Sequence, residues 1–180
     1  MPTIFFIFLV VCGAVMQRPG ESDLEPANPE MQKLAKAFAG NWKTQEVFAH
    51  NEFYPKGAER QGTARFTLAT GGTSLMEEVH SDGSAGRLDF IAIIWWDKDA
   101  QTYRVFTCGN GGNNPCKLRG TAHWDGASFS NEYELRLRGA DRKWRDTFSE
   151  IKVGSFKLVA AMDDADGTFQ PAITTYYTRK

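Results

Sequence analysis

The sequence has no excess of charge of either sign, because its 180 residues include 21 lysines and arginines and 22 aspartates and glutamates. Nucleic acids and anionic surfaces are usually bound through basic patches, which raise the net positive charge of a domain. A chain of this length can bury a full core within one domain. We therefore expect a single globular domain with no nucleic-acid partner.

Long apolar runs are also scarce. The run at residues 4–16 is shorter than the roughly 20 residues that a membrane-spanning helix needs. A polar, proline-containing stretch follows it, and this succession is typical of an export signal. We expect a signal-like segment at 1–17, a polar linker at 18–28 and the folded domain at 29–180, secreted or periplasmic, with no stable membrane span in the mature chain. An uncleaved N-terminal anchor and lipidation of Cys12 are the alternatives.

Cysteine and histidine are rare, with three of each. Cys108 and Cys116 bracket a glycine- and asparagine-rich loop that can fold back on itself, so we expect a disulfide at the base of a long hairpin. The histidines form no His-x-His or His-x-x-x-His pair, so no metal site is expected. The sequence has no nucleophile elbow, phosphate-binding glycine loop or triad spacing. Catalysis is therefore the less favoured interpretation, and we expect no cofactor.

The chain is rich in short runs of aromatic residues and threonine, which favour strands. Asn28 and Pro29 predict the start of one amphipathic helix, and Gly40 its end. Ten strand-like runs follow, separated by turn signals such as Asp125-Gly126. They cover residues 42–51, 62–69, 73–81, 88–96, 103–108, 117–124, 128–138, 143–153, 156–162 and 169–179. The predicted fold class is all-β: a single antiparallel up-and-down β-barrel of about ten strands with a short N-terminal helix.

Alternation of apolar and polar residues predicts which side chains face the interior of this barrel. The clearest example is 129–137, where apolar residues and Asn131 alternate with charged residues and Ser130. The run 90–96 is instead apolar on both faces. We expect its outer side to be covered, either by the N-terminal helix or by a second copy of the chain, which makes strand 88–96 a candidate contact for a homo-oligomer.

The segment Gly40-Asn41-Trp42 resembles the start of a calycin, or lipocalin-like, barrel. In those barrels a Gly-x-Trp opens the first strand, and its tryptophan closes one end of the barrel beneath an arginine from the last strand, a position that Arg179 fits. From residue 29 onward the chain also resembles a bacterial family of lipocalin-like domains of unknown function. The positions that carry this second resemblance are Gly72, Leu75, Glu77, Glu78, Gly86, Trp96, Asp97 and Tyr103. The resemblance implies a fold and no particular activity.

We expect the barrel to be open at one end and to bind a small apolar or amphipathic molecule in its interior. The candidate ligand-binding residues at inward positions are Glu46, Phe48, His50, Phe66, Glu78, Phe90, Asn131, Tyr133, Asp146, Phe148 and Tyr177.

Three alternatives to a binding module remain. Asp146 and Glu150 share a face with two aromatic residues, although the opposite face of their strand fits the interior almost as well. A carboxylate among aromatic residues has a raised pKa, which suits a cofactor-free isomerase or hydrolase. A filled barrel would instead be a structural or interaction domain. Haem bound through His50 or His80 is the third alternative.

Overall fold

The structure, a computed structural model, describes residues 28–52, 54–110, 116–137, 140–164 and 166–180. The expected signal-like segment, Cys12 and nearly all of the expected linker lie outside these ranges. Ten strands follow one helix, α1 (Pro29–Phe38): β1 (Gly40–Phe48), β2 (Ala58–Ala69), β3 (Ser74–Gly83), β4 (Leu88–Asp97), β5 (Thr102–Gly109), β6 (Cys116–Trp124), β7 (Phe129–Leu137), β8 (Ala140–Lys152), β9 (Ser155–Asp163) and β10 (Phe169–Arg179).

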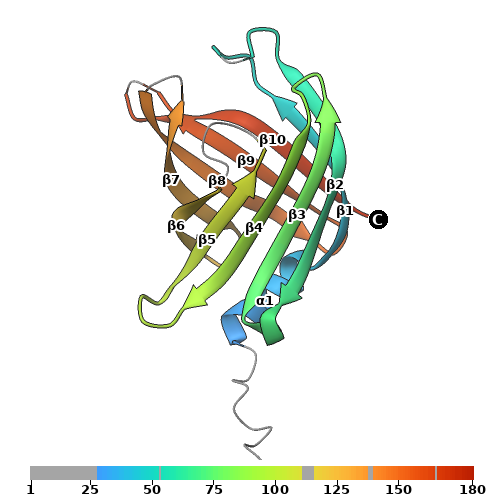
Figure 1. Cartoon of the computed structure of the whole chain (residues 1–180), viewed down its shortest axis with the longest axis vertical. Helices are drawn as coiled ribbons and strands as arrows, with labels where there is room; N and C mark the ends of the chain where they lie inside the picture. The colour runs from blue at the N-terminus through green and yellow to red at the C-terminus, as the bar shows by residue number, and fades with distance from the viewer. Residues whose placement is uncertain (1–27, 53, 111–115, 138–139, 165) are drawn as a thin grey trace, which may run out of the picture.

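Each strand pairs with its neighbours in the sequence, and β1 also pairs with β10, so the sheet closes into a barrel (Figure 1). All pairs with a described register are antiparallel. The predicted all-β class, the ten-strand barrel and the N-terminal helix are confirmed. In the described part of the chain, no helix has the length and apolar character to cross a membrane.

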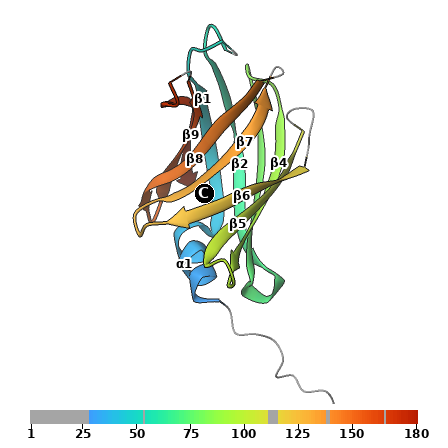
Figure 2. The same ribbon diagram turned by 90° about the vertical axis from the view of Figure 1, so that its left-hand side faces the viewer.

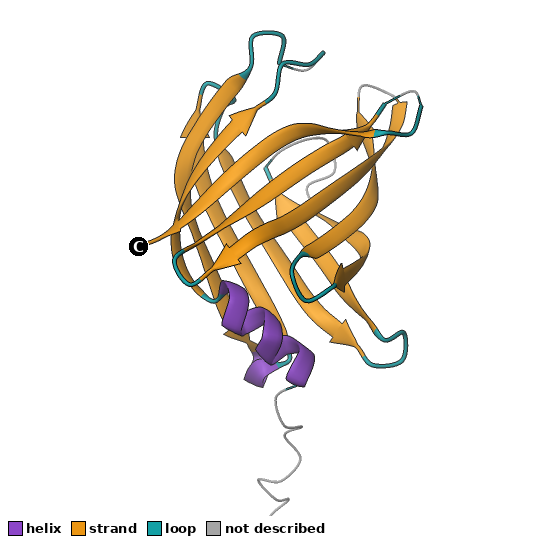
Figure 3. Cartoon of the chain, turned by 180° about the vertical axis from the view of Figure 1, so that it is seen from behind, coloured by secondary structure: helices purple, strands orange, loops and turns teal. Residues whose placement is uncertain are grey.

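Helix α1 lies across one end of the barrel (Figure 3). The Asn28 side chain accepts a hydrogen bond from the backbone N–H of Glu30 at 2.9 Å, which caps the helix. Met31, Leu34 and Phe38 are buried and belong to the same hydrophobic core as the inward-facing strand residues. Phe38 lies at the centre, with aromatic rings packed around it from β2, β6, β7, β8 and β9. The interior of the barrel at this end is therefore filled with packed side chains.

The outer side of β4 is not covered by α1. The helix packs against inward-facing side chains, and Ile91 on the outer side of β4 is 37% exposed. The expectation that the helix covers this face is therefore wrong, since the apolar stripe of α1 is used to close the end of the barrel. A contact between two copies through strand 88–96 stays a prediction.

The barrel wall is irregular near β6. Cys108 pairs with Cys116 across β5 and β6 and forms the predicted disulfide. Further along β6, the register with β5 shifts, so that Arg119 and Gly120 together face Val105 in a β-bulge. On its other side, β6 pairs with β7 only over residues 122–124, and the two strands diverge beyond them (Figure 2).

Candidate ligand-binding cavity

A cavity of about 320 Å³ occupies the end of the barrel opposite α1. This volume lies at the lower end of the range found for small-molecule sites, roughly 300–1,000 Å³. All the strands contribute lining side chains, mostly from the strand ends remote from the helix: Glu46, Arg60, Glu77, Val79, Leu88, Phe90, Thr107, Gly109, Arg119, Tyr133, Leu135, Trp144, Asp146, Phe148, Leu158, Ala160, Ile173, Thr175 and Tyr177. Apolar side chains predominate, and five ionisable groups of Glu, Asp and Arg are set among them.

Glu46 and Arg60 form a buried ion pair in the cavity wall. The Arg60 Nη2 donates to Glu46 Oε2 at 2.6 Å and its Nε to the same oxygen at 3.1 Å. Ser81 Oγ donates to the other carboxylate oxygen at 2.6 Å. The Arg60 guanidinium also lies 4.8 Å from the centre of the Phe48 ring. Because both charges are paired and hydrogen-bonded, this pair adds no net charge to the cavity.

Glu77 is the most deeply buried carboxyl group of the cavity. Burial, as the largest cause, and the nearby acidic Asp146 and Glu46 together raise its pKa to about 8, against a lowering contribution from its hydrogen bond with Tyr177. The Tyr177 hydroxyl donates to Glu77 Oε1 at 3.2 Å. Glu77 is therefore protonated at neutral pH and can itself donate a hydrogen bond.

Asp146 lies in a second polar cluster, on β8. It accepts hydrogen bonds from the Tyr133 hydroxyl at 2.9 Å and from the Trp144 Nε1 at 3.0 Å. Burial raises the pKa of Asp146 to about 6, while these two hydrogen bonds and the charge of Arg119 oppose the rise. The carboxyl group therefore changes its protonation state close to neutral pH.

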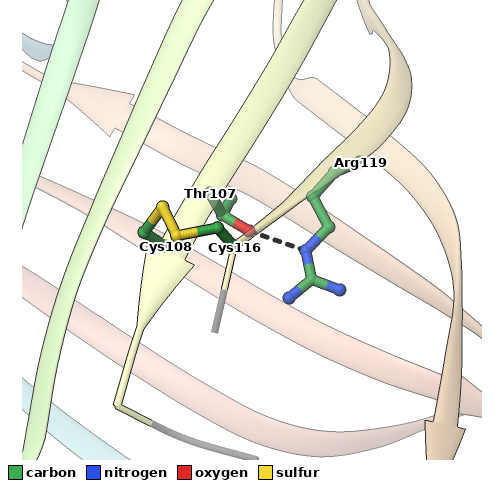
Figure 4. The surroundings of a disulfide bond; sticks show 4 residues. All are labelled: Thr107, Cys108, Cys116 and Arg119. Carbon is green, nitrogen blue, oxygen red and sulfur yellow. Dashed lines mark hydrogen bonds between the residues drawn. A yellow bond between two sulfur atoms is a disulfide. The ribbon is translucent and has the colours of Figure 1, made fainter. Parts of the chain in front are cut away.

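Arg119 brings a positive charge into the cavity from β6. Its Nε donates to Thr107 Oγ1 at 2.8 Å, close to the disulfide (Figure 4). The guanidinium lies 4.7 Å from the centre of the Tyr133 ring, a cation–π distance. The Nη1 is buried and has no hydrogen-bond partner among the described residues. Arg119 is thus a cation with part of its hydrogen-bonding capacity unused.

Six of the eleven candidate ligand-binding residues line the cavity: Glu46, Phe90, Tyr133, Asp146, Phe148 and Tyr177. Three others are buried elsewhere. Phe48 packs against Tyr54, Phe66 belongs to the core near α1, and Asn131 is buried outside the cavity lining.

The predictions for the remaining two candidates, His50 and Glu78, are wrong, because neither side chain faces the interior. His50 is exposed, since β1 ends at Phe48 and the alternation that placed His50 inside does not continue past the strand. Glu78 points outward, and its neighbour Glu77 takes the inward position opposite Phe66. His80 is also outside, hydrogen-bonded to Asp89 at 2.9 Å. No histidine of the chain therefore lines the cavity to ligate a haem there.

The expectation that Glu150 faces the interior is also wrong, because its side chain is exposed. A register shift between β8 and β9 lies between Ser149 and Lys152, and Glu150 there has a φ of 53°. The carboxylate is thereby turned outward, where it pairs with Lys157. In the described part of the chain, no group of three or more His, Cys, Asp or Glu side chains is placed to hold a metal ion.

A sequence profile of the family described as "Protein of unknown function (DUF1579)" matches residues 27–179. The chain belongs to this family. Its barrel resembles the crystal structure of Rv2717c from M. tuberculosis, with a TM-score of 0.57 and 15% identity over 85% of this chain and 98% of that chain. This likeness concerns the fold alone.

Designed barrels are also similar to this chain. A de novo designed fluorescence-activating β-barrel has a TM-score of 0.44 and 15% identity, covering 81% of this chain and 96% of that one. A second designed barrel, EF1p2_mFAP2b bound to DFHBI, has a TM-score of 0.46 and 12% identity, covering 83% and 99%. No curated protein matches the sequence.

Sequence reasoning found some polar side chains of this DUF1579 cavity, such as Glu46 and Asp146, but missed four others: Arg60, Glu77, Arg119 and Trp144. Of these four, Trp144 was the easiest to predict, because it lies two residues from Asp146 and therefore on the same face of the strand. Chemically, the set combines one neutralised ion pair, one protonated carboxyl, one carboxyl that titrates near neutrality and one unpaired cation. Such a set can orient an amphipathic molecule, and it can also exchange protons with it.

Proposed function

We propose that this protein is a lipocalin-like carrier or sensor that binds one small amphipathic molecule in the open end of its barrel. The observation that carries the proposal is the unequal filling of the interior. Phe38 and the rings around it fill the helix end, while about 320 Å³ stays hollow at the other end. The hollow also supports ligand binding over a purely structural barrel, because a structural core gains stability from close packing and loses it around a cavity.

The distribution of side chains supports an amphipathic rather than a purely apolar ligand. Phe90, Leu135 and Leu158 offer apolar surface, whereas the Tyr133–Asp146 and Tyr177–Glu77 pairs offer hydrogen-bonding groups. Pockets for small molecules combine a mainly apolar lining with a few placed polar groups of this kind.

We propose further that the protein works outside the cytoplasm, secreted or in a periplasm. The Cys108–Cys116 disulfide supports this location, because such bonds persist in oxidising compartments. The apolar run at residues 4–16 agrees with it as a sequence feature.

The binding proposal is tested with N-phenyl-1-naphthylamine, a neutral amphipathic probe that fluoresces in apolar surroundings. The wild-type protein is expected to bind one probe molecule saturably. The variant Leu135→Trp, which fills the cavity, should lose at least tenfold in affinity, whereas Glu134→Trp on the exposed face of the same strand should not. Equal binding by both variants, or none by the wild type, would overturn the proposal.

Catalysis is the second candidate, and Asp146 is the observation that favours it. Its pKa of about 6 and its place in the cavity suit a general base that takes a proton from a water molecule as that water attacks the carbonyl of a bound ester and the alcohol leaves. Hydrolysis of p-nitrophenyl butyrate should then exceed the buffer rate and fall about 100-fold in Asp146→Asn. The exposed Asp141→Asn serves as the control on the same strand. A wild-type rate equal to that of buffer excludes this esterase activity.

A further inference from the structure

Arg119 faces the cavity because of the bulge in β6. Regular alternation back from the buried Ala122 would place Gly120 and Leu118 inside and Arg119 outside. The extra residue at the bulge reverses this order, so Leu118 is 53% exposed and Arg119 lines the cavity. Gly120 has a φ of 79°, a conformation that glycine adopts without strain. The local backbone therefore turns the charged Arg119 side chain into the barrel and the apolar Leu118 side chain outward.

The two cations of the cavity differ in their partners. Arg60 has a carboxylate at 2.6 Å, in Glu46. Arg119 forms no ion pair with any described residue, and its one hydrogen bond is to the neutral hydroxyl of Thr107. Its Nη1 is buried without an acceptor, which is costly for a charged group. Arg119 is therefore the member of the cavity wall that most lacks a partner.

The carboxyl groups nearby do not supply that partner. Glu46 is occupied by Arg60 and Ser81, and Glu77 hydrogen-bonds Tyr177. Asp146 accepts one hydrogen bond on each oxygen, from Tyr133 and Trp144, and its charge interacts with Arg119 without a direct ion pair. A molecule in the cavity can supply the missing acceptor after a small rotation of the guanidinium.

We infer that the ligand of this cavity carries an anionic oxygen group, such as a carboxylate, which Arg119 binds while the apolar part of the ligand packs against the leucine and phenylalanine side chains. This inference rests on the proposed function. A guanidinium binds a carboxylate through two parallel charge-assisted hydrogen bonds, so it distinguishes an acid from the alcohol of equal chain length.

The test compares octanoate with 1-octanol, which differ in the head group alone, by titration calorimetry on the full barrel. Octanoate should bind the wild type about 10- to 100-fold more tightly than octanol, the ratio expected for one charged hydrogen-bonding contact. Arg119→Gln should reduce this ratio to about one without changing the affinity for octanol. Arg136→Gln removes the same charge from an exposed position of β7 and should leave the ratio unchanged.

The outcomes show whether this inference, the binding proposal or both fail. Equal affinity of the wild type for acid and alcohol overturns the inference, and this result does not depend on any variant folding. An unchanged ratio in a folded Arg119→Gln variant overturns it as well. If N-phenyl-1-naphthylamine binds and octanoate does not, the inference fails and the proposed function stands. If neither binds, both fail.

Discussion

The guanidinium of Arg179, in the last strand, lies 4.5 Å from the centre of the Trp42 ring, in the first strand. The two residues are also directly paired between β1 and β10. Trp42 Nε1 donates to the Phe38 carbonyl at 2.8 Å, and Arg179 Nε donates to the Val153 carbonyl at 3.0 Å. The stack therefore connects the helix, both ends of the folded chain and the β8–β9 turn at the closed end of the barrel.

The first prediction concerns Gly40 beside this stack. A Cβ at Gly40 would lie 2.7 Å from the Arg179 Nη1, and the φ of 143° disfavours other residues there. Gly40→Ala should therefore displace Arg179 from Trp42 and cost about 2–3 kcal/mol of unfolding free energy in urea. In an Arg179→Gln background the cost should be about 1 kcal/mol smaller, because the clash and the stack are already lost. Equal costs in the two backgrounds would contradict this explanation.

The second prediction concerns the pH dependence of stability. The pKa of Glu77 is about 8 in the folded protein and ordinarily 4.5, so between these values the folded state holds a proton that the unfolded state has released. The raised pKa of Glu77 makes its full contribution to the free energy of unfolding below pH 4.5. That contribution is lost as pH rises to about 8. Glu77→Gln, which mimics the protonated form, should add on the order of 2–4 kcal/mol at about pH 8 and little at about pH 4.

Thermal unfolding from about pH 4 to about pH 9 measures this difference. Glu134→Gln, at an exposed position, is the control and should follow the wild-type pH profile. A Glu77→Gln curve that runs parallel to the wild type from pH 4.5 to about 8 would mean that Glu77 is ionised in the folded state.

The third prediction concerns the disulfide. Cys108 and Cys116 are eight residues apart, so their bond closes a short loop and should contribute about 2–3 kcal/mol. Dithiothreitol should lower the midpoint of thermal unfolding of the wild type and leave that of the Cys108→Ser/Cys116→Ser variant unchanged. A wild-type midpoint that does not respond to complete reduction, checked by thiol counting, would show that the bond does not stabilise the fold.

The fourth prediction concerns the bulge at Gly120. Gly120→Val should cost about 1–3 kcal/mol, because a β-branched residue is strained at a φ of 79°. Deletion of Gly120 should cost less, because it removes the bulge and leaves Arg119 inside and Leu118 outside. Urea unfolding compares the two variants, and a deletion more damaging than the valine substitution would mean that the bulge itself is needed.

Much of the fold could be predicted because its local signals agree with one another. The expected strand 169–179 coincides with β10, and 88–96 differs from β4 by one residue. Turn residues fix the ends of these strands, and alternation along β7 fixes its inner face. These signals depend on neighbours in the sequence, so they require no knowledge of the tertiary structure.

The cavity was less predictable because its key positions depend on irregularities or on pairing between strands. At Arg119 and Glu150, β-bulges reverse the alternation of inward and outward side chains. No pattern in the sequence predicts these bulges. In β3, Glu77 and Glu78 are adjacent and chemically alike, so alternation could not choose between them. The pairing of Glu77 with the inward-facing Phe66 decides that choice. The pKa values that follow from burial could not be predicted before these positions were known.

The central claim is that a small molecule binds at the end of the barrel opposite α1, and the tryptophans report on it directly. Trp144 lines the cavity, Trp42 is buried at the helix end, and Trp124 borders a separate surface hollow beside α1. The measurement is a two-dimensional ¹H–¹⁵N NMR titration of the indole N–H signals with 1-anilinonaphthalene-8-sulfonate. We predict that the Trp144 signal shifts saturably while those of Trp42 and Trp124 stay in place. A saturable shift of Trp124 with no shift of Trp144, or no indole shift at saturating probe, would contradict the claim.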